Sequence, residues 1–313
     1  MTERALAVAP TLCIPKPRTV VLALARRLVP PPAVIAFGLL ILAWTIAAPI
    51  VNYDRVRENL IRSREPVTIG ALISGGWSLE RPVLPAPHQI AADIWSSSTS
   101  ASVTSRRNLL YHVWATLSAS VCGLAGGLAL GALLAVLLVE FRLFEAAVLP
   151  WLVASQTIPT LAIAPIVVVL LGRLGVGGLA QKALIDALIV FFPITLALIK
   201  GLRSPDSSML DLMRTYAAGR LEILIKIRLP AALPFLFPAL KVAAALSVVA
   251  TIVAELPTGA EAGLGARILV GSYTGLMLVL WSAFVAASLT SAFLIGAVTL
   301  CERVVFGALG GRA

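Results

Sequence analysis

The sequence predicts an all-α polytopic membrane protein with about six transmembrane helices. Its residues are 59% hydrophobic and only 13% charged, with a mean hydropathy of +0.97. A soluble globular chain is usually about half apolar and about a quarter charged. Several apolar stretches are also about 20 residues long, which is the length of helix that crosses a bilayer. The lysines and arginines are dispersed between these stretches, where they act as topology signals.

Six stretches of the chain are long and apolar enough to cross a bilayer. They cover residues 33–51, 109–139, 146–172, 177–199, 230–254 and 274–300. An even number of spans places both termini on the same side of the membrane. The first apolar stretch begins only after a long basic lead, so we expect an uncleaved first span rather than a secretory signal.

The positive charges choose the side on which the termini lie. Lysine and arginine are retained in short cytoplasmic loops. The N-terminal arm carries five such residues, and the segment from Lys200 to Arg228 carries six. We therefore expect this segment and both termini in the cytoplasm.

These assignments divide the chain into a simple series of parts. They are a cytoplasmic N-terminal arm at 1–32, a first transmembrane helix at 33–51, an external (periplasmic) loop at 52–108, a membrane core at 109–305 with a long polar connection at 201–230, and a cytoplasmic tail at 306–313. The external loop includes the piece PHQIAADIWSS, which reads as a short helix along the outer surface. No separate domain is expected in that loop.

Several functions are disfavoured by residues that the chain lacks. The net charge of +10 is not gathered with aromatic residues into one face, which disfavours nucleic-acid binding. Cys13, Cys122 and Cys301 are widely spaced, and only His88 and His112 are present, so no metal site is expected. No phosphate-binding loop with its lysine occurs, so the chain itself is not expected to hydrolyse ATP.

Charged residues inside the spans are candidates for structural or transport roles. Lys182 and Asp186 stand four residues apart in the fourth span and can neutralise each other, so we expect an intramembrane ion pair. Glu255 lies at the external end of the fifth span. It could form an outer gate or simply be solvated, and the solvated state is favoured.

The third span contains a polar motif. Ser155, Gln156 and Thr157 precede Pro159, whose ring removes a backbone donor and bends a helix. Polar side chains and free carbonyls then gather near the middle of the membrane. Lining of a substrate path and hydrogen bonding between helices are equally compatible with this pattern.

Small residues recur in the second span. Gly123, Gly126, Gly127 and Gly131 are three or four residues apart, the spacing that lets helix backbones approach closely in lipid. We expect close helix packing there.

The polar connection between the fourth and fifth spans is patterned as an amphipathic helix. Its apolar positions Leu210, Met213, Ala217, Leu221 and Leu224 recur at helical spacing. Such a face could rest on lipid headgroups or contact another protein, and periodicity leaves both open.

This connection resembles the coupling loop of ABC importer permeases. The family pattern is Glu-Ala-Ala, three residues, Gly, nine residues, Ile, one residue and Leu-Pro. Aligned here, it falls on Asp211, Ala217, Ile227, Leu229 and Pro230. Ala217 replaces the glycine of the turn, and Gly219, two residues on, can take its role.

The resemblance extends from about residue 87 to 305. Its five blocks are PAPHQIAADIW, ASQTIPTLAIAPIVVVLLG, FFPITLALIKGLRSPD, RLPAALPFLFPALKVA and VAELPTGAEAGLGARI. They resemble the nitrate, sulfonate and taurine class of MetI-like permeases, which includes transporters of pyrimidine-type vitamin precursors and riboflavin. The resemblance implies a MetI-like fold in the bacterial inner membrane. It also implies import of a small organic solute by alternating access.

The resemblance further implies roles for residues and partners. ATPase coupling would fall on Asp211, Ala217, Ala218, Gly219, Ile227, Leu229 and Pro230. The expected partners are ABC ATPase subunits, a second copy or a homologous permease, a periplasmic substrate-binding protein and membrane lipid, with no nucleic acid. ATP and magnesium would bind the ATPase, and no cofactor is expected in this chain. An ion-coupled secondary transporter is the alternative, although intramembrane carboxylates are few.

Overall fold

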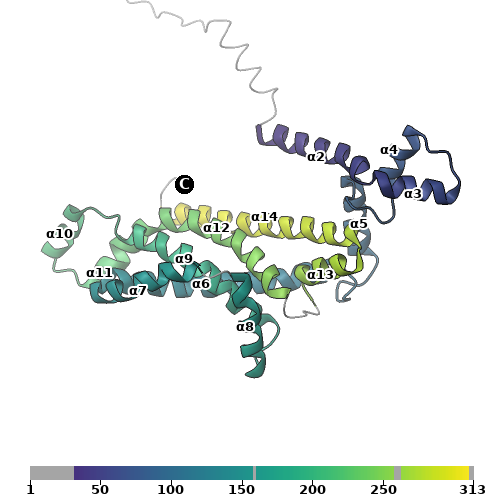
Figure 1. Cartoon of the computed structure of the whole chain (residues 1–313). Helices are drawn as coiled ribbons and strands as arrows, with labels where there is room; N and C mark the ends of the chain where they lie inside the picture. The colour runs from purple at the N-terminus through teal and green to yellow at the C-terminus, as the bar shows by residue number, and fades with distance from the viewer. Residues whose placement is uncertain (1–31, 158–159, 257–261, 310–313) are drawn as a thin grey trace, which may run out of the picture.

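The computed structural model describes residues 32–157, 160–256 and 262–309, and most of them are helical (Figure 1). The helices are α2 (Pro32–Val51), α3 (Tyr53–Ser63), α4 (Ile69–Ser78), α5 (Pro87–Thr99), α6 (Leu109–Glu140), α7 (Arg142–Ala154), α8 (Thr160–Arg173), α9 (Leu179–Leu202), α10 (Ser207–Thr215), α11 (Arg220–Ile223), α12 (Leu229–Glu255), α13 (Leu264–Thr274) and α14 (Met277–Ala308). A 3-10 turn covers Ser155–Thr157, and a π-helical turn, η2, covers Leu224–Arg228. The predicted cytoplasmic arm lies almost entirely outside the described residues.

The prediction of about six membrane helices is confirmed. Within the described residues, five helices are long and apolar enough to cross a bilayer, and a sixth span results if α7 and α8 are counted as one bent pair. Helices α6, α9, α12 and α14 form an elongated bundle, in which α9 packs between α6 and α12 (Figure 1). The core of the bundle is apolar and includes Val190, Ile194, Val248 and Leu294.

The predicted third span is broken rather than continuous. Helices α7 and α8 meet at an angle of 106°, and α8 projects away from the bundle (Figure 1). Before the break, Ser155 Oγ donates to Leu152 O at 2.7 Å and Thr157 Oγ1 donates to Ala154 O at 2.8 Å. These bonds tighten the last turn of α7 and satisfy carbonyls that a continuing helix would use. Pro159 lies outside the described residues.

The predicted close packing of the glycine-rich span is confirmed, and the partner is α9. A Cβ atom on Gly123 would lie 2.2 Å from Asp186 Oδ2, and one on Gly127 would lie 2.3 Å from Val190 Cγ2. Neither distance is possible for a real side chain without movement. These glycines therefore set the distance between α6 and α9.

The segment at 52–108, which was predicted to be external, folds more fully than the sequence suggested. The short helix expected near residue 87 is present as α5, and it packs against α14 and α6. Helices α3 and α4 form an additional hairpin beside α2. The buried Asn52 side chain accepts hydrogen bonds from Val83 N and Leu84 N and donates to Gly76 O and Leu84 O. This one side chain thus joins the end of α2 to the hairpin and to the segment that follows it.

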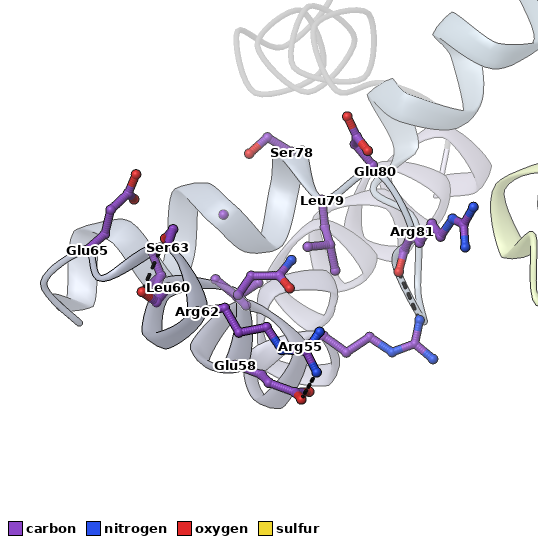
Figure 2. A pocket seen from close by; sticks show the side chains of 13 residues that line it. Arg55, Glu58, Leu60, Arg62, Ser63, Glu65, Ser78, Leu79, Glu80 and Arg81 are labelled. Atoms are coloured by element: carbon purple, nitrogen blue, oxygen red, sulfur yellow. Dashed lines mark hydrogen bonds and ion pairs between the residues drawn. The ribbon is translucent and has the colours of Figure 1, made fainter.

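A cavity of about 800 Å³ opens on the α3–α4 hairpin (Figure 2). Its charged lining residues are three arginines and three glutamates, Arg55, Arg62, Arg81, Glu58, Glu65 and Glu80. Some of these charges are used within the hairpin, because Arg62 pairs with Glu58 at 2.7 Å and Arg55 Nη1 donates to Arg81 O at 2.9 Å. The charged lining of this cavity is balanced.

Candidate functional site

Polar side chains from three helices meet inside the apolar bundle. We call this group the polar cluster, and it comprises His112, Thr116 and Ser120 on α6, Lys182 and Asp186 on α9, and Ser247, Thr251 and Glu255 on α12. All of its members are buried. On each helix they are four residues apart, so they lie on one face of the helix. The polar cluster therefore joins α6, α9 and α12 near the end of the bundle that holds α13.

The predicted Lys182–Asp186 ion pair is wrong. Lys182 Nζ lies 3.0 Å from Glu255 Oε1, and it also donates to Ala262 O at 2.7 Å. The tertiary packing explains the change of partner, because α12 ends beside the first turn of α9 and brings its terminal carboxylate to the ammonium group. The ion pair thus connects two helices and the segment that leads into α13.

Glu255 is fully buried, so the favoured prediction that it is solvated is wrong as well. Its carboxylate accepts hydrogen bonds from Thr116 Oγ1 at 3.0 Å and from Gly265 N at 2.7 Å, in addition to Lys182. Gly263 permits this arrangement, because its φ is +138° and a Cβ atom there would lie 2.1 Å from the carboxyl carbon. The backbone at Gly263 therefore lies directly against the buried carboxylate.

Asp186 has different neighbours one turn deeper in the bundle. Its Oδ2 atom contacts Ser247 Oγ, which also lies 2.9 Å from Ser120 O. Ser120 Oγ donates to Thr251 Oγ1 at 2.9 Å. Within the described residues, Asp186 Oδ1 is buried without a hydrogen-bond partner. Buried charges and polar groups are costly to separate from their partners, so this arrangement holds the three helices in one relative position.

The polar motif of the broken third span borders a cavity of about 240 Å³. Ser155 and Gln156 line it together with Ile163 and residues of α9, including Ile185 and Leu188. The hydroxyls of Ser155 and Thr157 are bonded within their own turn. Among the described contacts, Gln156 is the member of the motif whose side chain makes no hydrogen bond within the chain. The role in lining a substrate path stays a prediction, and within this motif it rests on Gln156.

The segment that resembles a coupling loop forms a helix, a tight turn and a second helix. Helix α10 ends in a turn where Ala217 N donates to Arg214 O at 2.9 Å and Ala218 N donates to Met213 O at 3.1 Å. This bonding pattern requires a left-handed residue after the helix. Ala217 is that residue, with a φ of +52°, whereas Gly219 has a φ of −70°. The expectation that Gly219 takes the role of the turn glycine is wrong, and Ala217 adopts the strained conformation itself.

Helix α10 exposes an apolar face, but not through the residues that periodicity suggested. Leu210 and Met213 are half-buried, whereas Met209, Leu212 and Tyr216 are 50%, 55% and 77% exposed. At 100° per residue, these three side chains share one face of the helix. We call them the α10 apolar face.

Asp211 lies on the other side of α10 from the α10 apolar face. Its Oδ1 atom accepts from Arg214 Nη1 at 2.8 Å, and both side chains are largely exposed. The carboxylate that the family pattern places at the start of the motif is therefore paired within its own helix. An exposed pair of this kind contributes little to stability and leaves both groups accessible.

The second half of this segment is continuous with the fifth span. Leu229 N donates to Leu224 O, so a π-helical turn carries the chain from α11 into α12. Pro230 follows this turn, where its missing N–H breaks the ordinary helical bonding. Arg228 pairs with Glu140 at the end of α6 at 2.6 Å. The segment that contains Ile227, Leu229 and Pro230 is thereby fixed to the bundle.

The sequence carried a signal for the polar cluster that residue-by-residue reasoning missed. His112, Thr116 and Ser120 repeat every four residues, as do Ser247, Thr251 and Glu255 in another span. Such a polar stripe within an apolar helix must face protein rather than lipid. A further contact, between Lys241 Nζ on α12 and Glu302 Oε2 on α14 at 2.5 Å, was also missed.

Comparison with known proteins agrees with this architecture. Residues 127–306 match the model of the family described as binding-protein-dependent transport system inner membrane component. A probable ABC transporter permease protein of Haemophilus influenzae is 34% identical over 66% of this chain and 81% of its own length. The formylaminopyrimidine transport permease protein ThiX of Halalkalibacterium halodurans is 36% identical over 58% of this chain and 68% of its own length.

A third relative is the riboflavin transport system permease protein RibX of Chloroflexus aurantiacus, which is 32% identical over 59% of this chain and 65% of its own length. The family match covers the second half of α6, all of α9 and α12 with their members of the polar cluster, most of α14, and the segment that resembles a coupling loop. These matches confirm the resemblance inferred from the motifs. The chain therefore belongs to the family of binding-protein-dependent transport system inner membrane components, the permease subunits of ABC importers.

Proposed function

We propose that this chain is the membrane subunit of an ATP-driven importer that moves a small organic solute across the bacterial inner membrane by alternating access. The observation that carries the proposal is the coupling segment. Its first helix, α10, presents an exposed apolar face beyond the end of the bundle, and its second helix, α11, continues without interruption into a membrane helix. The names of the relatives, which mention formylaminopyrimidine and riboflavin, favour an organic solute.

In this proposal, α10 and α11 lie in the cytoplasm with both chain termini. The lysines and arginines between Lys200 and Arg228 support this side of the membrane. Here the α10 apolar face docks in a groove of an ABC ATPase subunit, which also binds the ATP and magnesium. No cofactor is assigned to this chain.

A continuous helix provides the mechanical connection between ATPase and solute path. The helical segment Arg220–Glu255 has 36 residues, which corresponds to roughly 54 Å at 1.5 Å per residue. One end carries the coupling segment and the other end carries Glu255 of the polar cluster. Movement of α10 by the ATPase would therefore be transmitted to the Lys182–Glu255 ion pair. Such coupling works if the ATPase binds the two positions of the helix with different affinity.

The remaining partners follow from the architecture of the family. A single six-span chain encloses too small a path, so a second copy or a homologous permease completes it. Helix α8 supports this proposal, because it projects from the bundle with Ile166, Val169 and Leu170 each at least 59% exposed (Figure 1). A periplasmic substrate-binding protein delivers the solute from the side opposite α10.

Two neighbouring substitutions test how α10 docks. Leu212→Arg introduces a charge on the α10 apolar face, and Asp211→Arg introduces the same residue on the opposite side. We expect Leu212→Arg to abolish co-purification of the ATPase subunits and ATP-driven uptake. Asp211→Arg should retain more of both activities than Leu212→Arg, because Asp211 lies off the α10 apolar face and is paired with Arg214.

If Asp211→Arg abolished ATPase association and uptake while Leu212→Arg retained them, the ATPase contact would lie on the side of α10 that carries Asp211. Retention of ATPase association and uptake by both variants would contradict docking through this helix. Family membership already favours the importer over an ion-coupled secondary transporter. Uptake into vesicles that depends on ATP, and persists when proton and sodium gradients are collapsed, would complete that distinction.

A further inference from the structure

An apolar cavity lies between the end of α2 and helix α4. It has a volume of about 470 Å³, and its lining includes Ile46, Pro49 and Ile50 of α2 and Ile69, Ile73 and Trp77 of α4. We call it the α2–α4 cavity. None of the described residues that line it is charged. Its walls are therefore made almost entirely of hydrocarbon.

Helix α4 separates this cavity from the charged cavity of Figure 2. At about 100° per residue, Ile69, Ile73 and Trp77 share one side of the helix. Gly75 and Ser78, which line the charged cavity, lie on the other side. The α3–α4 hairpin therefore has an apolar side, which contacts α2, and a charged side. Such an arrangement is typical of helices that lie at a membrane surface.

Contacts along α2 show how deep the α2–α4 cavity lies. Trp77 Nε1 donates to Thr45 O at 2.9 Å, and a Cβ atom on Gly76 would lie 2.5 Å from Pro49 Cα. Thr45 comes six residues before Val51, the last residue of α2, which corresponds to roughly 9 Å along the helix. This part of α2 belongs to a candidate membrane span. The end of α4 therefore lies beside the membrane-spanning part of α2 rather than beyond it.

The α2–α4 cavity opens onto a surface that the described part of the chain leaves uncovered. Only 6% of the apolar stretch of α2 is buried. Ile46 and Ile50, which line the cavity, are 55% and 69% exposed, and Ile69 on α4 is 78% exposed. Large exposed apolar patches mark contacts with a membrane or with another protein. Because α2 spans the membrane, this surface is continuous with the hydrocarbon of the bilayer.

We propose that the α2–α4 cavity holds one acyl chain of a phospholipid. In the topology proposed above, this lipid belongs to the outer leaflet, and the charged side of the hairpin faces the headgroups and the water. Tyr53 and Trp77 line the same cavity, and these residue types are enriched where membrane and water meet. The lipid joins α4 to α2 in addition to their direct contacts.

The chemistry of the lining favours an acyl chain over a second copy of this protein. Interfaces between proteins combine an apolar centre with a polar rim and about one hydrogen bond per 100–200 Å². The indole N–H of Trp77 is already bonded to Thr45. Among the other described lining residues, the Tyr53 hydroxyl is the one polar side-chain group. A protein partner would therefore find few hydrogen-bonding groups here, whereas an acyl chain needs none.

The first test measures whether Trp77 touches an acyl chain. The full chain is placed in phosphatidylcholine nanodiscs whose acyl chains are brominated, because bromine quenches tryptophan fluorescence on contact. The contribution of Trp77 is the intensity that Trp77→Phe removes, measured in brominated and in ordinary phosphatidylcholine. We expect most of this contribution to be lost in the brominated lipid. If it is the same in both lipids, Trp77 does not meet an acyl chain and the proposal is overturned.

The second test measures whether the lipid is held at this site. Ile73→Trp places a larger side chain in the cavity, and native mass spectrometry counts the phospholipids that stay bound to the purified chain. We expect one phospholipid fewer for Ile73→Trp than for the unmodified chain. Leu289→Trp, at a position of α14 that is 62% exposed, is the matched control and should retain the unmodified number.

An unchanged number of phospholipids in Ile73→Trp would overturn the proposal, even if Trp77 is quenched, because the lipid would then be exchanging freely. Weaker self-association of Ile73→Trp together with unquenched Trp77 would overturn it as well and would assign the cavity to a second copy. Unfolding temperatures of both variants show that a loss of lipid is not a loss of fold. Neither test uses ATP or solute, so its failure would leave the proposed import untouched.

Discussion

The buried ion pair between Lys182 and Glu255 gives the sharpest test of the structure. Lys182→Met keeps a long apolar side chain but removes the ammonium group, so Glu255 is left buried with no cation at 3.0 Å. The side chains of the pair are 8% and 0% exposed. Removing one partner of a buried pair costs about 3–5 kcal/mol, because the remaining charge is not compensated. Thr116 and Gly265 still donate to the carboxylate, which places the expected loss near the lower limit.

The assay is unfolding of the purified chain in mixed micelles, followed by circular dichroism. A loss of about 3 kcal/mol corresponds to a decrease of roughly 5 °C in unfolding temperature, because the entropy of unfolding is about 2.1 cal/mol/K per residue and the chain has 313 residues. Arg62→Met is the matched control. Arg62 pairs with Glu58 at 2.7 Å, but the side chains are 74% and 61% exposed. Such a surface pair contributes at most about 1 kcal/mol.

A double variant separates the charge from the packing. In the double variant Lys182→Met, Glu255→Gln, neither side chain of the pair is charged. The amide oxygen of the new glutamine can still accept from Thr116 and Gly265. We expect this variant to recover much of the stability lost in Lys182→Met. If Lys182→Met were no more destabilising than Arg62→Met, the assignment of a buried pair between α9 and α12 would be refuted.

Two further substitutions test backbone geometry in the same unfolding assay. Gly123→Ala should destabilise the chain by at least about 2 kcal/mol, since its Cβ atom would overlap Asp186, whereas Gly126→Ala meets its neighbour at 3.5 Å and should be neutral or stabilising. Ala217→Gly should relieve the strained turn after α10 by about 1 kcal/mol. It should also slow amide exchange of Ala218, whereas Ala218→Gly should not; equal effects of the two would contradict the assigned turn.

The segment that resembles a coupling loop shows how much of a local structure a sequence motif can predict. The spacing of the motif drew attention to the segment between Asp211 and Pro230, where the structure has a helix, a tight turn and a second helix. Its role in coupling stays a prediction. The motif did not show which face of α10 is exposed. Leu210 and Met213 fit the periodicity as well as Met209 and Leu212 do. The choice between these faces depends on how the helix rests against the bundle, which no local pattern encodes.

The charged residues of the spans also show what the sequence predicts and what the packing of the helices decides. Lys182 and Asp186 were recognised as intramembrane charges, and their spacing of four allowed an ion pair within one helix. The actual partner of Lys182 is 73 residues away in the sequence. Local spacing shows which contacts are possible, but the competition among partners is decided by which helices pack together.

The sequence by itself determined that this protein is a helical membrane permease with a polar connection that resembles a coupling loop. Apolar runs of membrane length, dispersed positive charges and a motif register are local properties, and the physics of the bilayer acts on them directly. Only the tertiary structure decided that α9 packs between α6 and α12 and that Glu255 is buried against Lys182. These features depend on contacts between residues far apart in the chain, whose free energies exist only once the helices have packed.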